Sequence, residues 1–135
     1  MEGDFLDNLQ HGNWVFWFAS GKIHHQGKYD SGEMTGAWQY YYEDGSDYKR
    51  GNFFEDKKEG VWEFWFENGN PLQRGSFTND LEQGDWESWH PNTNKASVGS
   101  FNAGELSGIW TGWYESGVKQ YEGKWKGNLR VGEWN

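Results

Sequence analysis

A strict repeat of 24 residues constrains the fold more than any other feature of the sequence. A first glycine recurs once in each period, and a tryptophan follows it two positions later. A second glycine recurs in the same way and is followed two positions later by an aromatic residue. Because the register never slips, the sequence predicts a linear array in which each unit packs only against its neighbours, and these columns are expected to be structural. The columns are Gly12, Gly36, Gly60, Gly84 and Gly108 with Trp14, Trp38, Trp62, Trp86 and Trp110, and then Gly27, Gly51, Gly75, Gly99 and Gly123.

The apolar residues agree with an array that has no central core. Aromatic residues make up 20% of the chain, whereas all hydrophobic types together reach only 34%, so branched aliphatic residues are scarce. Flat aromatic side chains suit a thin sheet, because each can cover neighbouring backbone without a second layer. We therefore expect one array over residues 1–135. Its full units are 12–35, 36–59, 60–83, 84–107 and 108–131, with partial units at 1–11 and 132–135.

Each unit is predicted to be a β-hairpin. Residues 62–66 are aromatic and β-prone, and Gly69 closes a three-residue turn that follows them. A second strand then runs to the second glycine, and a polar six-residue loop such as 78–83 leads to the next unit. No apolar pattern has the period of a helix. The predicted fold class is all-β, an elongated single-layer antiparallel meander of about eleven strands built from 24-residue β-hairpin repeats.

The fourth unit departs from this pattern. Its turn has Thr93 where the other units have glycine, and we expect Asn92 or Asn94 to take the left-handed conformation instead. Ser88 and Gly112 replace an aromatic residue that the first three units share. The sheet is therefore expected to be less aromatic towards the C-terminus.

A second aromatic column is the candidate binding surface. Alternation along a strand places Trp62 on one face, where we expect it to lie across a second-column glycine, and Trp65 on the other face. Two interpretations of the Trp65 column stay open. Its members either pack on the Phe53 and Phe77 column, or stand as an exposed ladder with a spacing of ~10 Å. The column consists of Trp17, Tyr41, Trp65, Trp89 and Trp113.

Catalytic and metal chemistry find little support in the sequence, so we expect a non-enzymatic protein without a cofactor. There is no cysteine, and no serine lies in a nucleophile elbow. His24 and His25 are neighbours on a predicted strand and are expected to point to opposite faces, so we predict no metal site. Carboxylates such as Glu55, Glu59 and Glu82 are expected to lie mainly in solvated loops.

The charge balance bears on the partner. Twelve basic and 21 acidic residues give a net charge of −9, which disfavours nucleic acid and anionic membrane and suits a basic protein or peptide. Residues 1–4 show no features of a signal peptide, which favours the cytoplasm unless a leader has been removed. The oligomeric state is left open.

The repeat columns resemble the bacterial variant of the MORN repeat. The best matches are residues 60–69, which read GVWEFWFENG, and residues 108–117, which read GIWTGWYESG. The resemblance implies a twisted sheet of hairpins that acts as a scaffold for partners. Bacterial members are often labelled antitoxins, and eukaryotic relatives are linked with membranes.

Two alternative functions stay open beside protein binding. The aromatic ladder could serve as a stacking platform for sugar rings in a carbohydrate-binding module. The chain could also be a membrane-associated MORN-type scaffold. Choline- and glucan-binding repeats likewise use Trp-rich hairpins, but their unit is shorter than the 24-residue period found here.

Overall fold

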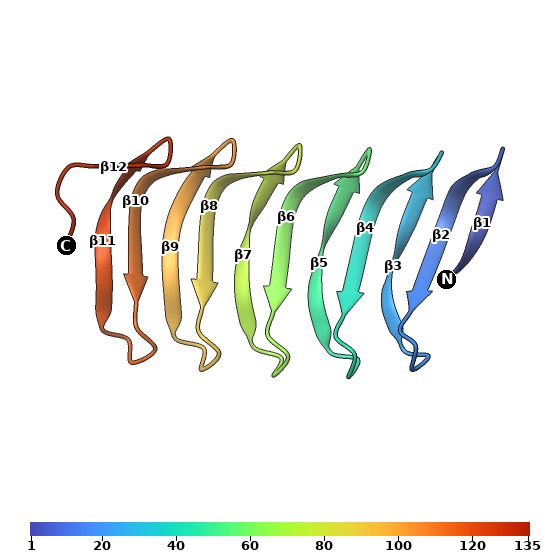
Figure 1. The fold of residues 1–135 in the computed structure, drawn as a ribbon, viewed down its shortest axis with the longest axis horizontal. Helices are drawn as coiled ribbons and strands as arrows, with labels where there is room; N and C mark the ends of the chain where they lie inside the picture. The colour runs from blue at the N-terminus through green and yellow to red at the C-terminus, as the bar shows by residue number, and fades with distance from the viewer.

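The computed structural model describes residues 1–135 as a single sheet of twelve antiparallel strands that follow one another in chain order (Figure 1). The prediction of an all-β meander is confirmed, with twelve strands instead of about eleven. No helix in it is long and apolar enough to cross a membrane. The strands are β1 (Glu2–Leu6), β2 (Leu9–Trp17), β3 (Ile23–Asp30), β4 (Glu33–Tyr41), β5 (Asp47–Phe54), β6 (Lys57–Trp65), β7 (Pro71–Thr78), β8 (Leu81–Trp89), β9 (Lys95–Asn102), β10 (Glu105–Trp113), β11 (Lys119–Lys126) and β12 (Leu129–Val131).

The hairpin turns that contain glycine have the predicted geometry. In the third unit Gly69 has a φ of 89°, in the left-handed region that glycine adopts without a steric penalty. Its N–H donates to the Phe66 carbonyl over 3.0 Å, and the Phe66 N–H donates to the Asn70 carbonyl over 2.9 Å. These two bonds close a three-residue loop between β6 and β7.

The fourth hairpin turn corrects the sequence prediction. Thr93 itself is left-handed, with a φ of 77°, whereas neither Asn92 nor Asn94 has a positive φ. The Thr93 N–H donates to the His90 carbonyl over 2.9 Å, as glycine does in the other turns. The hydrogen bonds of the loop therefore outweigh the local preference of asparagine and impose a strained conformation on a β-branched residue.

We expect the variant Thr93→Gly to be more stable than the natural chain. Relief of the left-handed penalty, roughly 1–2 kcal/mol, exceeds the extra entropy that glycine brings to the unfolded state, so the net gain should be about 1 kcal/mol. Urea unfolding followed by far-ultraviolet circular dichroism measures it. Thr93→Ala keeps the left-handed Cβ and should gain little. A loss of stability in Thr93→Gly would contradict the strain argument.

The connections between units are shorter than predicted. Asn79 and Asp80, with φ values of 51° and 70°, form a two-residue turn in place of the six-residue loop, and the flanking residues belong to β7 and β8. Two successive left-handed residues match the twist of the adjoining strands. Glu59 and Glu82 consequently lie in β6 and β8 and not in loops, whereas Glu55 does occupy a turn.

Neighbouring turns are tied together along this edge of the array. The Asp80 N–H donates to the Lys58 carbonyl over 3.1 Å, and the Asp80 carboxylate accepts from the Lys58 N–H over 2.7 Å. Asp56 and Met34 repeat both contacts one unit earlier. Each turn therefore stacks on the turn of the preceding unit, which couples neighbouring units outside the sheet ladder itself.

The first-column glycines bend alternate strands. Gly60 has a φ of 72°, and the pairing between β5 and β6 passes from Arg50 with Glu63 to Asn52 with Glu59, so residues 60–62 all lie opposite Gly51. Such a β-bulge turns the strand. Figure 1 shows β4, β6, β8 and β10 curving as they leave the two-residue turns. The bulge also carries the side chain of Trp62 across the neighbouring strand.

The buried hydrophobic residues belong to a single line of aromatic rings in mutual contact, which we call the aromatic spine. Trp62 is fully buried, and its ring covers Gly51, where an added Cβ would lie 2.1 Å from Trp62 Cδ2. Trp62 Nε1 donates to the Asn52 carbonyl over 3.1 Å. Its ring meets Phe53 and Phe77 edge-on, with centroids 5.1 and 6.3 Å apart. The spine consists of Phe5, Trp14, Tyr29, Trp38, Phe53, Trp62, Phe77, Trp86, Phe101 and Trp110.

Candidate binding surface

The face opposite the aromatic spine carries a continuous groove. One hollow of about 660 Å³ has Gly27 and Gly51 among its lining residues, and a second of about 550 Å³ has Gly75 and Gly99. Both hollows are lined by Val61 and Arg74, so they join into one depression that crosses the strands. We call this depression the groove. The second-column glycines form part of its floor, because a spine tryptophan covers their other face.

A row of polar side chains runs through the groove, one from each successive strand. Cross-strand pairing brings Gln39 beside Arg50, Arg50 beside Glu63, Glu63 beside Arg74, and Arg74 beside Glu87. The charges therefore alternate along the direction in which the units repeat. Opposite charges directly across a strand pair stabilise the sheet, and they also present both signs to a ligand.

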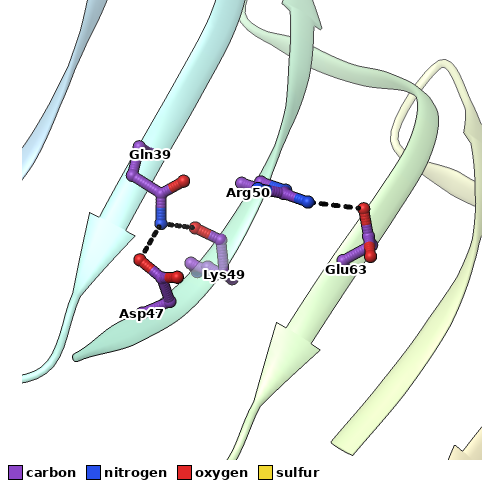
Figure 2. A network of polar contacts seen from close by, with 5 residues as sticks. All are labelled: Gln39, Asp47, Lys49, Arg50 and Glu63. Atoms are coloured by element: carbon purple, nitrogen blue, oxygen red, sulfur yellow. Dashed lines mark hydrogen bonds and ion pairs between the residues drawn. The ribbon is translucent and has the colours of Figure 1, made fainter. Parts of the chain in front are cut away.

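Figure 2 shows how the middle of this row is held. Arg50 Nη2 donates to Glu63 Oε1 over 3.3 Å, which joins β5 to β6. Gln39 Nε2 donates to Asp47 Oδ1 over 3.3 Å and to the Lys49 carbonyl, which joins β4 to β5. Arg74 forms none of the ion pairs in the structure. Its guanidinium is thus the groove cation that a carboxylate ligand would meet.

The predicted ladder lies on the groove side of the sheet. Trp17 is 39% exposed, and Tyr41, Trp65, Trp89 and Trp113 are half-buried. Packing on the Phe53 and Phe77 column does not occur, because both of these rings contact Trp62 in the spine on the other face. The first interpretation of this column is therefore wrong. Side-chain alternation separates the two sets, since Trp65 follows Trp62 by three residues along β6.

Polar or charged neighbours contact three of the five ladder rings. The Arg50 guanidinium lies 5.0 Å from the centre of the Trp65 ring, and Lys95 Nζ lies 4.7 Å from that of Trp89. Gln26 Nε2 donates to the Tyr41 hydroxyl over 3.1 Å. Cation–π contacts of this kind hold a ring in place and cover one of its faces. The ladder is therefore an ordered margin of the groove, and its rings are not fully free.

The histidine pair corrects another sequence prediction. His24 and His25 do not point apart, because their Nδ1 atoms lie 2.7 Å from each other. The cause is a bulge: Phe16 pairs with His25 and Trp17 with Ile23, which leaves His24 as the extra residue. Burial, helped by the charges of His24 and Lys49, lowers the pKa of His25 to about 4, so His25 is neutral at pH 7.

Metal ligands do not gather anywhere in the chain. No three side chains among the His, Asp and Glu residues are grouped so that they could hold a metal ion. The paired histidines lack a third ligand, and the rings of Phe16 and Tyr40 stack on either side of His25, with centroids 4.2 and 5.1 Å away. The pair is therefore part of the aromatic packing.

Sequence reasoning missed the charged residues of the groove. Glu63 and Glu87 each follow a spine tryptophan, and Arg50 and Arg74 each precede a second-column glycine. These positions could have been read as strand interiors on the face opposite the tryptophan, because side chains alternate along a strand. Whether these side chains form a row of alternating charge depends on the register between strands. The bulges shift this register, and the repeat pattern alone does not define it.

A single-layer sheet of hairpins with one covered glycine per unit defines a repeat scaffold, in which each unit is stabilised by its neighbours. Residues 10–31, 58–79 and 106–126 each match the family model described as the MORN repeat variant. The chain is a MORN-repeat protein of this variant, and the units between the matched segments carry the same columns of glycine and tryptophan. No curated protein matches the chain.

Proposed function

We propose that this MORN-repeat protein is a non-enzymatic scaffold that binds an extended segment of a partner protein along the groove. The observation that carries the proposal is the joining of the two hollows through Val61 and Arg74 into one depression. A groove that crosses the strands offers the same set of contacts every two strands. An extended peptide with side chains at regular intervals can use such a surface, whereas a small ligand would fill only one hollow.

The charge of the chain supports a basic partner. Its net charge of −9 creates a field that steers a basic protein towards the sheet and raises the association rate. A basic toxin, neutralised by occupation of its surface, is the finer form of the proposal and makes this chain an antitoxin. The alternating charges in the groove would then fix the register of the bound segment.

Carbohydrate binding is the weaker candidate. Stacking of a sugar needs an open ring face, and Arg50 and Lys95 already lie over the rings of Trp65 and Trp89. A glycan array separates the two functions. Saturable binding of one polysaccharide that is lost in Trp65→Ala would favour the carbohydrate function over protein binding. Binding to anionic vesicles would instead favour a membrane scaffold, which the acidic balance disfavours.

Peptide selection tests the proposed function. A random peptide library displayed on phage is selected on the immobilised protein, and the affinity of an enriched peptide is then measured for each variant. Trp65→Ala and Trp89→Ala should each weaken binding by roughly tenfold or more if the ladder carries a hot spot. Both variants should keep the far-ultraviolet spectrum of the natural protein.

The matched control is Tyr114→Ala, since Tyr114 is an exposed aromatic residue that lines neither the groove nor the adjoining hollow in which Trp65 and Trp89 lie beside Arg74. Its affinity should not change. Association of a basic enriched peptide should slow strongly between ~0.05 and ~0.5 M salt, because the Debye length falls well below ~10 Å. Equal affinity in all variants would refute a binding hot spot on the ladder margin of the groove, and a salt-insensitive association rate would refute steering by charge.

A further inference from the structure

The fourth unit leaves a hollow on the spine side of the sheet, the face opposite the groove. Ser88 pairs with Ser97 across β8 and β9, and their hydroxyl oxygens lie 2.5 Å apart. In the unit before it the same two positions hold Phe64 and Gln73. In the unit after it Gly112 is covered by the ring of Tyr121. Only the fourth unit therefore has two small residues at this place.

Aromatic rings surround this vacant place. The hollow has a volume of about 340 Å³, and Phe77, Trp86, Phe101 and Trp110 line it. Trp86 and Trp110 donate their indole N–H groups to backbone carbonyls, so both rings are fixed. A volume near the lower end of the range for ligand sites, about 300–1,000 Å³, fits a single side-chain group and not a larger ligand.

The chain itself shows which group fits against such rings. Lys58 occupies the position four residues before its spine tryptophan, and its Nζ lies 5.7 Å from the Trp62 ring centre and 5.2 Å from that of Phe77. Arg130 occupies the same position in its unit, and its guanidinium lies 4.7 Å from the Trp134 ring centre. A cation therefore lies against the rings of this face at two places along the array.

The strand that leads into the fourth unit, β8, has the opposite charge at that position. Glu82 stands four residues before Trp86, lines the hollow and forms no ion pair. The hollow therefore combines aromatic rings, two hydroxyl oxygens and a carboxylate without a cation. A planar guanidinium group suits the rings, the hydroxyl oxygens and the carboxylate. It stacks on aromatic rings and can donate hydrogen bonds to carboxylate and hydroxyl oxygens at the same time.

We propose that this hollow binds the guanidinium group of an arginine side chain supplied by a partner. The site lies on the spine side of the sheet, so it does not depend on whether the groove binds anything. It adds a specific contact on the second face, so that a partner with a suitably placed arginine could engage both sides of the sheet. Its chemistry also agrees with the acidic balance of the chain.

Titration with Nα-acetyl-arginine amide, followed by the indole N–H signals in nuclear magnetic resonance spectra, tests the proposal. The signals of Trp86 and Trp110 should shift and saturate, whereas those of Trp14 and Trp38 should stay in place. Glu82→Gln should raise the dissociation constant by about tenfold, because it removes the charge-assisted hydrogen bonds. Ser88→Phe should weaken binding, because it places a ring where Phe64 lies one unit earlier and removes one hydroxyl oxygen.

Two controls separate the cation site from a general effect of charge. Glu67→Gln removes one carboxylate at an exposed hairpin turn and should leave the dissociation constant unchanged. The citrulline analogue has nearly the shape of the arginine amide but no charge, and it should not bind. If Ser88→Phe does not fold, Glu82→Gln and citrulline still decide the question. Equal binding of citrulline, or unchanged affinity in Glu82→Gln, would overturn the proposal.

Discussion

Trp62→Ala is expected to lower the free energy of unfolding by about 3–5 kcal/mol, the range for the loss of a large buried aromatic side chain. Trp62 is fully buried, and its removal uncovers the backbone of Gly51. The variant also loses the edge-on contacts with Phe53 and Phe77 and leaves the Asn52 carbonyl without its indole donor. A sheet of one layer has no second core that could move in to fill the space.

Urea unfolding measures this loss, and Phe54→Ala is the matched control. Phe54 is also aromatic and lies on β5 next to Phe53, but it is 60% exposed, so its removal should cost much less. Hydrogen exchange should show the loss of protection centred on β5, β6 and β7, because units couple to their nearest neighbours. Equal destabilisation by the two variants would show that the spine is not the stabilising element.

Gly75→Ala is expected to destabilise the protein by about 3 kcal/mol, at the upper end of the cost of overpacking. An alanine Cβ at this position would lie 2.0 Å from Cδ2 of Trp86. The Trp86 ring cannot easily move aside, since its Nε1 donates to the Ser76 carbonyl and its faces meet Phe77 and Phe101. The clash must therefore be relieved by separating β7 from β8.

A double-mutant cycle shows whether the ring causes the effect. Once Trp86→Ala has removed the ring, Gly75→Ala should cost little more, so the two single losses should not add. Ser76→Ala, one residue further along β7, is the control and should be nearly neutral. Full additivity of Gly75→Ala and Trp86→Ala would mean that the glycine is needed for its backbone freedom and not for the space above it.

The two candidate sites place different demands on the same sheet. The groove depends on charged side chains from successive strands, and it continues along the array. The hollow near Ser88 arises because one unit has two serines where its neighbours have at least one larger side chain. A repeat scaffold can therefore bind a partner through contacts that recur along the array and through a site formed where one unit departs from the repeat.

Local pattern was enough to predict the architecture of this protein. The spacing of Gly60, Trp62 and Gly75 indicates the hairpin and the ring that covers a glycine, because both features arise between residues close in the chain or related by one period. Gly69 indicates the three-residue turn for the same reason. These features need no knowledge of how distant segments meet.

The charged row, the turn at Thr93 and the histidine pair depend instead on the register between strands and on competition between local preferences. Arg50, Glu63 and Arg74 form a charged row only because bulges shift the pairing by whole residues, which no single strand specifies. Thr93 becomes left-handed because two hydrogen bonds of its loop outweigh its own preference. The bulge at His24 likewise turns two rings towards one face. Side-chain alternation predicts faces in a regular strand, and each bulge resets it, so the binding surfaces follow from the tertiary pairing.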